Sequence, residues 1–154
     1  MSGLQLDIQI ATQEINLPNS EQFLLWAQTA LISKTLFEIT LRLVEENESQ
    51  ALNNTYRQKP YATNVLTFPA EAPLPFRSNH LGDIVICAPR VTQEAHEQHK
   101  AVTAHWAHLV VHSVLHLQGY DHQTDADALI MESLEIDILQ QLGFPNPYGA
   151  ATRS

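Results

Sequence analysis

The chain has 154 residues, 44% of them apolar, which is enough to bury a hydrophobic core, and we expect residues 1–154 to form a single domain. The 17 Asp and Glu residues outnumber the 8 Lys and Arg residues, and the resulting formal net charge of -9 argues against a protein that binds nucleic acid non-specifically. The single cysteine, Cys87, excludes an intrachain disulfide, and because the sequence shows no signal peptide or membrane-spanning stretch, we expect a cytoplasmic protein.

Alternating apolar and polar residues predict two strands in the first third of the chain. Residues 4–10 and 37–44 both follow the period of two that is typical of a half-buried strand. Between them, residues 21–33 have helical periodicity, with Asn19 or Ser20 available as the N-cap. Residues 45–57 are rich in helix formers but have few apolar anchors, so we expect a short surface helix there.

The second half of the chain adds two strands and then becomes helical. Residues 64–69 and 81–88 predict strands, separated by a proline-rich loop. After Pro89 the pattern predicts helices to the end of the chain, including long ones over 101–118 and 125–142. Together these elements predict an α/β (α+β) fold, in which a mixed four-stranded sheet packs with about five helices.

In the last predicted helix, we expect Ile130, Leu134 and Ile138 to lie in the core. Its acidic residues should then form the solvated face: Asp125, Asp127, Glu132, Glu135 and Asp137.

Five of the eight histidines lie between residues 105 and 122, and three of them predict a metal site. On a helix, His112 and His116 are one turn apart and point the same way. Gly119 can end this helix in the left-handed conformation, so that the following turn returns His122 toward the other two. Zn²⁺ accepts imidazole nitrogens, and a site with three protein ligands keeps its fourth position open for catalysis.

The remaining histidines are assigned to other roles. His108 extends the stripe one turn upstream, and we expect it to orient His112 or to be an ordinary core residue rather than a fourth ligand. The others are expected at the surface: His96, His99 and His105 on helices and His80 in a loop.

The histidine spacing also matches the metal-binding part of the metzincin peptidase motif. In those peptidases a glutamate follows the first histidine and acts as the general base, whereas this chain has Ser113 at that position. A peptidase mechanism therefore lacks its base.

The segment HSVLHLQGYDH, residues 112–122, is similar to the H-G-x-L-H-L-x-G-Y-D-H signature of the YbeY family of bacterial metal-dependent endoribonucleases. Three further segments resemble that family in the same order: LNNTYR at 52–57, TNVLTFP at 63–69 and LGDIVI at 81–86. Three positions depart from the family pattern, with Asn64 for aspartate, Thr67 for serine and Ser113 for glycine. If the family's aspartate accepts a hydrogen bond from Arg57 or Lys59, Asn64 would weaken that contact.

The resemblance implies a zincin-like metal helix with one Zn²⁺ per chain on His112, His116 and His122, and it makes Arg57 the counterpart of the family's functionally important arginine. It implies cleavage of single-stranded RNA in 3′-end maturation of small-subunit (16S) ribosomal RNA, ribosome biogenesis and ribosome quality control. The implied partners are single-stranded ribosomal RNA and the small ribosomal subunit with its proteins. An assembly GTPase is a further candidate partner, whereas a membrane and DNA are not expected.

Arg57 suits this chemistry because its planar guanidinium can hold the non-bridging oxygens of a phosphate while the metal polarises an oxygen or activates a water. The general base stays open: Asp121 could accept a hydrogen bond from a ligand imidazole or cap its turn, and the RNA's own 2′-hydroxyl could attack instead of water.

We expect RNA to approach the side of Arg57, Lys59, Arg77 and Arg90. Two alternatives to the ribonuclease are a non-enzymatic ribosome-assembly factor with a structural metal and a metallopeptidase-like hydrolase.

Overall fold

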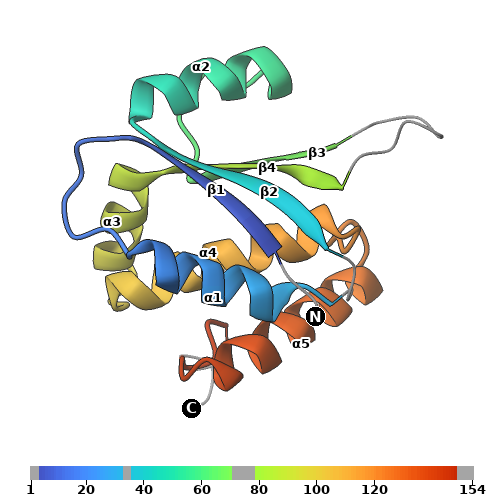
Figure 1. Ribbon diagram of the computed structural model, residues 1–154. Helices are drawn as coiled ribbons and strands as arrows, with labels where there is room; N and C mark the ends of the chain where they lie inside the picture. The colour runs from blue at the N-terminus through green and yellow to red at the C-terminus, as the bar shows by residue number, and fades with distance from the viewer. Residues whose placement is uncertain (1–3, 33–35, 71–78, 149–154) are drawn as a thin grey trace.

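Strands and helices alternate as far as residue 69, a further strand spans residues 80–87, and three helices follow it (Figure 1). The computed structural model describes residues 4–32, 36–70 and 79–148. The proline-rich loop and Arg77 lie outside these residues. The described elements are β1 (Leu4–Ala11), α1 (Ser20–Ala30), β2 (Phe37–Val44), α2 (Glu46–Arg57), β3 (Val65–Pro69), β4 (His80–Cys87), α3 (Ala88–Glu97), α4 (Val102–Leu117) and α5 (Asp125–Gln141).

The four strands form one mixed sheet in the order β1-β2-β4-β3. β1, β2 and β4 are parallel, and β3 runs antiparallel to β4, where Thr67 lies opposite Ile84. The predicted mixed sheet of four strands with five helices is thus confirmed. Among the described strands, β3 pairs with β4 alone, so its other edge is open for side chains from elsewhere in the fold.

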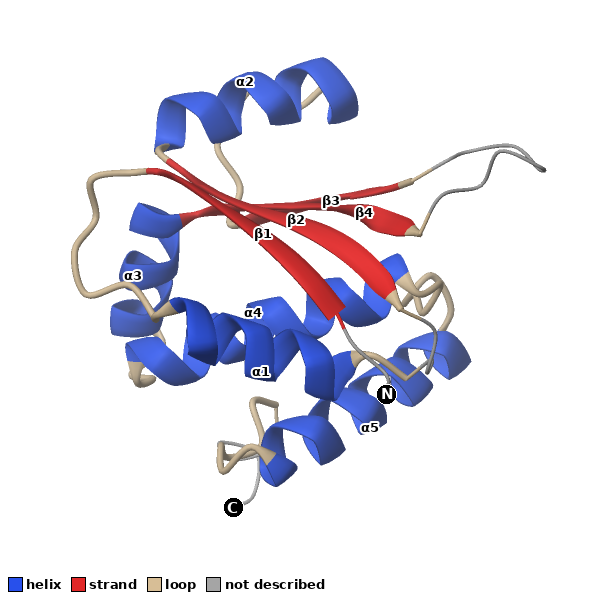
Figure 2. Cartoon of the chain, viewed as in Figure 1, coloured by secondary structure: helices blue, strands red, loops and turns tan. Residues whose placement is uncertain are grey.

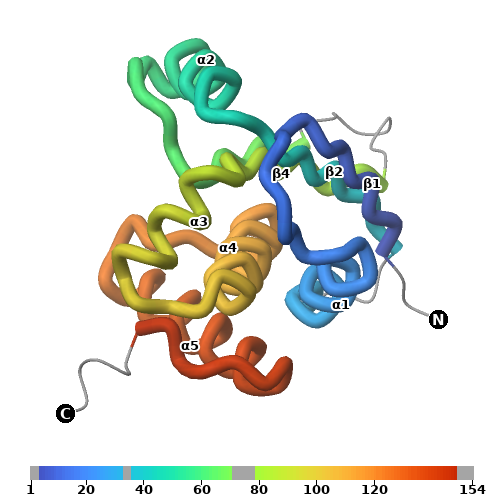
Figure 3. The backbone as a smooth tube through the Cα atoms, turned by 90° about the vertical axis from the view of Figure 1, so that its left-hand side faces the viewer, coloured from blue at the N-terminus to red at the C-terminus, as the bar shows by residue number. Residues whose placement is uncertain are grey.

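Helices cover the two faces of the sheet unequally (Figure 2): α2 lies on one face, and α1, α3, α4 and α5 lie on the other. α4 runs through the middle of this larger layer, with α1 and α5 beside it (Figure 3). Ten of its residues are buried, which explains why residues 101–118 are so apolar. Its position close to both the sheet and α5 makes α4 the framework of the candidate site.

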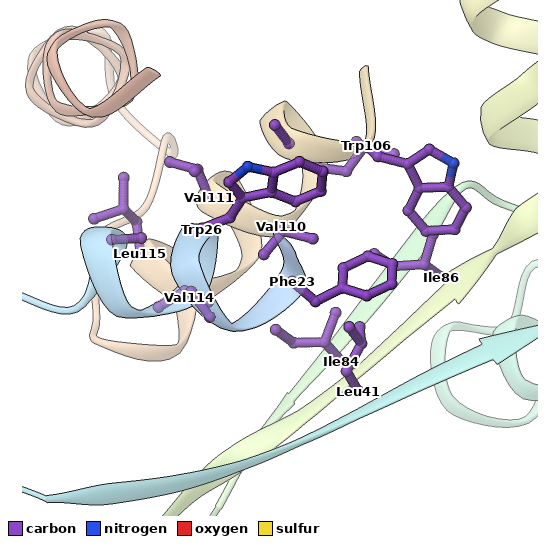
Figure 4. Packing of buried hydrophobic residues seen from close by; sticks show 14 of the residues in the cluster. Phe23, Trp26, Leu41, Ile84, Ile86, Trp106, Val110, Val111, Val114 and Leu115 are labelled. Carbon is purple, nitrogen blue, oxygen red and sulfur yellow. The ribbon is translucent and has the colours of Figure 1, made fainter. Parts of the chain in front are cut away.

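Three aromatic rings join α1 to α4 in the core (Figure 4). The ring of Phe23 meets those of Trp26 and Trp106 edge to face, with centroids 5.8 and 5.6 Å apart. Aliphatic residues of β2 and β4, among them Leu41 and Ile84, pack beneath the ring of Phe23. Burial of these large side chains fixes α4 against the sheet.

A close contact at Gly82 brings the end of α4 against β3 and β4. Gly82 has φ +157°, and a Cβ atom built there would lie 2.6 Å from the carbonyl oxygen of Phe68 and 2.7 Å from Cδ2 of Leu117. Only a residue without a side chain allows this approach. The glycine of the LGDIVI segment therefore has a packing role next to the histidine helix.

Four expectations about individual side chains are wrong. Ile130 is 55% exposed, because Met131, Ile138 and Leu139 form the buried face of α5 against α4. His105 is buried, since its ring turns inward to a carboxylate of α3. His80 belongs to β4 and not to a loop, and its Nε2 pairs with Asp83. Glu135 is fully buried and does not belong to a solvated face.

Among the helices in the described part of the chain, none is both long and apolar enough to cross a membrane.

Candidate metal centre

The structure brings together the three histidines that the sequence singles out. His112 and His116 project from the same face of α4, with ring centroids 6.5 Å apart. Gly119 has φ +105°, and the N–H groups of Gly119 and Tyr120 bond back to the carbonyls of His116 and Leu115. This left-handed turn ends the helix and returns the chain, so that the ring of His122 stacks on that of His112 at 5.7 Å.

The nitrogen atoms of these rings suit a metal, although the rings stand slightly too far apart. Around a tetrahedral Zn²⁺ with bonds of about 2.0–2.1 Å, ring centroids are roughly 5 Å apart. Within residues 4–32, 36–70 and 79–148, no group of three or more His, Cys, Asp or Glu side chains is close enough to hold a metal ion as it stands. The set of ligands itself fits, because Nδ1 of both His112 and His116 faces a protein oxygen, which leaves Nε2 of each ring to bind a metal ion.

Glu135 belongs to this site, although the sequence pattern predicted it on the solvated face of α5. Its carboxylate is fully buried and accepts hydrogen bonds from His112 Nδ1 at 2.5 Å, from His108 Nε2 at 3.0 Å and from the hydroxyl of Tyr148. A signal for its burial was present, because Glu135 lies four residues from both Met131 and Leu139, on the apolar face of α5.

Burial raises the pKa of Glu135, but the hydrogen bonds from His108, His112 and Tyr148 outweigh it and bring the pKa down to about 2. The carboxylate is therefore ionised at neutral pH and can only accept hydrogen bonds. Burial next to this carboxylate raises the pKa of Tyr148 well above its usual range, which keeps its hydroxyl protonated as a donor.

The ring of His116 is kept neutral by its surroundings. Burial lowers its pKa, and the nearby charges of His112, His122 and Arg57 lower it further, while Asp121 opposes them. A neutral imidazole is the form that binds a metal ion. Asp121 itself lies 3.9 Å from His116 Nε2, and its carboxylate accepts a hydrogen bond from the N–H of His122 at 2.7 Å. Of its two expected roles, the turn cap is the one that the geometry favours.

Arg57 reaches the site across the open edge of β3. It is the last residue of α2, which Gln58 ends in the left-handed conformation. Its Nη2 donates to the carbonyl of Thr67 at 3.0 Å, and its guanidinium lies over the ring of Phe68 at 5.7 Å. The hydroxyl of Thr67 lies 3.3 Å from His116 Nδ1, so one residue of β3 contacts both the arginine and the histidine cluster.

The remaining predicted residues have other partners. Asn64 donates through Nδ2 to Glu94 at 3.0 Å, and the same carboxylate oxygen lies 2.9 Å from His105 Nε2. Asn64 therefore supports a buried polar cluster next to α4, and its expected contact with Arg57 or Lys59 does not form. Arg90 is partly buried, and its Nε has no hydrogen-bond partner among the described residues.

Comparison with known proteins shows similarity along most of the chain. The family model described as "Endoribonuclease YbeY" matches residues 5–143. A protein of Colwellia psychrerythraea with the same name is 51% identical over 148 residues, which cover 93% of this chain and 96% of that protein. The solution structure of a Thermotoga maritima protein matches with a TM-score of 0.58 at 25% identity over 88% of each chain. All residues of the site except Tyr148 lie within the family match.

Proposed function

This chain belongs to the YbeY endoribonuclease family, and from that premise we propose that it cleaves single-stranded ribosomal RNA with the help of a metal ion bound by His112, His116 and His122. Membership in the family makes it an endoribonuclease, a hydrolase that acts on RNA. The proposal adds its place of action: 3′-end maturation of small-subunit ribosomal RNA and ribosome quality control in the cytoplasm, in contact with the small subunit and its proteins.

One observation carries the proposed mechanism: Thr67 contacts Arg57 through its carbonyl and His116 through its hydroxyl. A permanent cation therefore lies next to the histidine cluster. Cleavage of a phosphodiester passes through a transition state with increased negative charge on the phosphoryl oxygens, which preorganised cationic and hydrogen-bonding groups stabilise.

When bound, Zn²⁺ would supply a Lewis acid that polarises a phosphoryl oxygen. The chain's own residues hold the phosphate. Thr67 occupies one nitrogen of the Arg57 guanidinium, which leaves the other N–H groups to bind the non-bridging oxygens of a phosphate. The lowered pKa of His116 keeps its ring neutral, the form in which an imidazole nitrogen binds a metal ion.

The structure weighs against the metallopeptidase alternative. Ser113 stands where a peptidase of this motif has its glutamate base. Its side chain is fully buried, and its hydroxyl has no partner among the described residues. Position 113 therefore lies inside the core.

The first experiment compares the wild type with Arg57→Ala on a single-stranded fragment of small-subunit ribosomal RNA, with metal content measured in both proteins. We expect the wild type to cleave and Arg57→Ala to lose at least about 100-fold in rate at equal metal content, because one preorganised donor to the transition state contributes about that much. A cyclic phosphate on the product would identify the 2′-hydroxyl as the nucleophile.

Equal cleavage by both proteins would place Arg57 outside the reaction. If neither cleaves while both bind metal, the non-enzymatic assembly factor becomes the better interpretation.

A further inference from the structure

We propose that Glu135 is a positioning residue of the candidate metal centre, because its buried carboxylate holds the ring of His112 with the proton on Nδ1 and leaves Nε2 free for a divalent cation. This inference rests on the proposed function, since it concerns a residue that holds one of the expected ligands. The positioning role of Glu135 follows neither from the spacing of the histidines nor from the position of Arg57.

The surroundings of Glu135 indicate a specific role rather than ordinary packing. The side chain is fully buried at the contact between α5 and α4, where its neighbours on the same face, Met131 and Leu139, are apolar. A charge in such a place is strongly unfavourable unless hydrogen-bonding partners compensate for it. Among the described residues, its partners are the imidazoles of His108 and His112 and the hydroxyl of Tyr148, with no Lys or Arg.

The contacts of Glu135 determine which nitrogen of His112 carries the proton. An imidazole nitrogen is a stronger base than a carboxylate oxygen, so in the contact between His112 Nδ1 and the Glu135 carboxylate, 2.5 Å apart, the nitrogen holds the proton and donates it. In a neutral ring the lone pair is then on Nε2, the nitrogen available to a metal. The same reasoning places the proton of His108 on Nε2, which donates to the other carboxylate oxygen at 3.0 Å. His108 is thus a partner of Glu135 and not a fourth ligand.

Tyr148 fixes the carboxylate from a third side. After α5, Gly143 turns the chain back, and the ring of Phe144 packs edge to face on Trp26 at 5.9 Å. The ring of Tyr148 then lies 5.2 Å from that of His108, and its hydroxyl donates to Glu135. Three donors from two segments therefore restrain this one side chain, which limits how far the ring of His112 can rotate.

The test measures metal binding in Glu135→Gln. Amide and carboxylate have nearly the same shape, so the change removes charge and one acceptor while it keeps the volume. Loss of a carboxylate that supports a ligand histidine typically weakens metal binding about 10–100-fold. We expect a loss of this size in the dissociation constant for Zn²⁺, measured by competition with a chromogenic chelator. We also expect a changed visible spectrum of bound Co²⁺, which reports the geometry of its ligands.

Glu94→Gln is the matched control. Glu94 holds His105 of the same helix at 2.9 Å, and His105 is not an expected ligand. We expect Zn²⁺ affinity within about twofold of the wild type in this variant, because the contacts of His112 are unchanged.

An unchanged Zn²⁺ affinity and Co²⁺ spectrum in Glu135→Gln would overturn the inference while leaving the proposed function intact. A wild-type chain that binds neither ion would overturn both. If Glu135→Gln does not fold, ¹⁵N NMR of the wild-type histidine rings decides the matter: a proton on Nδ1 of His112 supports the inference, and a proton on Nε2 contradicts it.

Discussion

At the scale of the residue, α4 carries three histidines that contact carboxylates of neighbouring helices. Glu94 of α3 holds His105, and Glu135 of α5 holds both His108 and His112. The pair of His105 and Glu94 is largely shielded from solvent, so the protonation state of the His105 ring depends on the fold and not only on pH. For His105, burial lowers the pKa more than Glu94 raises it, and the ring is neutral at neutral pH.

This shift predicts how stability depends on pH. The pKa of His105 is lower in the folded state than in the unfolded chain. Below about pH 6.5 the unfolded chain therefore binds more protons at this residue, and the free energy of unfolding decreases as the pH falls through that range. We expect the free energy of unfolding, measured with urea, to decrease from about pH 7 to about pH 5, and to decrease less in His105→Gln. In the control, His96→Gln, the decrease should match the wild type, because His96 is exposed on α3. Parallel curves for all three proteins would contradict the assignment.

At the scale of the element, α5 shows why helical periodicity alone misplaces side chains. Its apolar residues occupy more than one stripe, and packing against α4 selects the face with Met131, Ile138 and Leu139. Glu135 lies on that face as a buried acid, while Ile130 is left at the surface. The sequence pattern was ambiguous because Glu135, on the buried face, is an acid like the residues of the exposed face.

Alanine substitutions on the two faces of α5 should differ in stability. Ile138→Ala leaves a cavity in the core and should lower the free energy of unfolding by about 2–5 kcal/mol. Ile130→Ala should change it by less than about 0.5 kcal/mol, because the side chain is largely exposed. Urea titration of both variants next to the wild type provides the measurement. Equal losses would mean that α5 packs through a different face.

At the scale of the whole molecule, charge limits where RNA can bind. The chain carries a net charge of -9, so RNA contact must depend on a local group of cations. Arg57 ends α2 next to the open edge of β3 and the histidine cluster, and Lys59 lies two residues further along the chain. Lys100 precedes α4 and is separated from His116 by about 20 Å of helix, at 1.5 Å per residue.

The effect of reversing a lysine's charge on RNA binding should therefore depend on where that lysine lies. We expect Lys59→Glu to weaken binding of single-stranded RNA and to reduce the slope of its salt dependence by about one to two units, because two charges change near the phosphates. Lys100→Glu makes the same change at the far end of α4 and should leave the slope unaltered. Fluorescence anisotropy at several salt concentrations measures both. A larger effect at Lys100 would move the RNA path toward the start of α4.

Periodicity and short motifs are local properties, so the class of fold, the order of its elements, the family and the four residues expected to carry the chemistry could all be predicted from the residues alone. The partners of those four residues could not, because they depend on how distant segments pack. The contacts of Arg57 with Thr67 and of His112 with Glu135 join segments that lie apart in the sequence, and they form where β3 leaves an edge open and α5 packs on α4. Glu135 and His105 were expected at the surface. Packing of the helices buries both side chains, and each has a hydrogen-bond partner in the core.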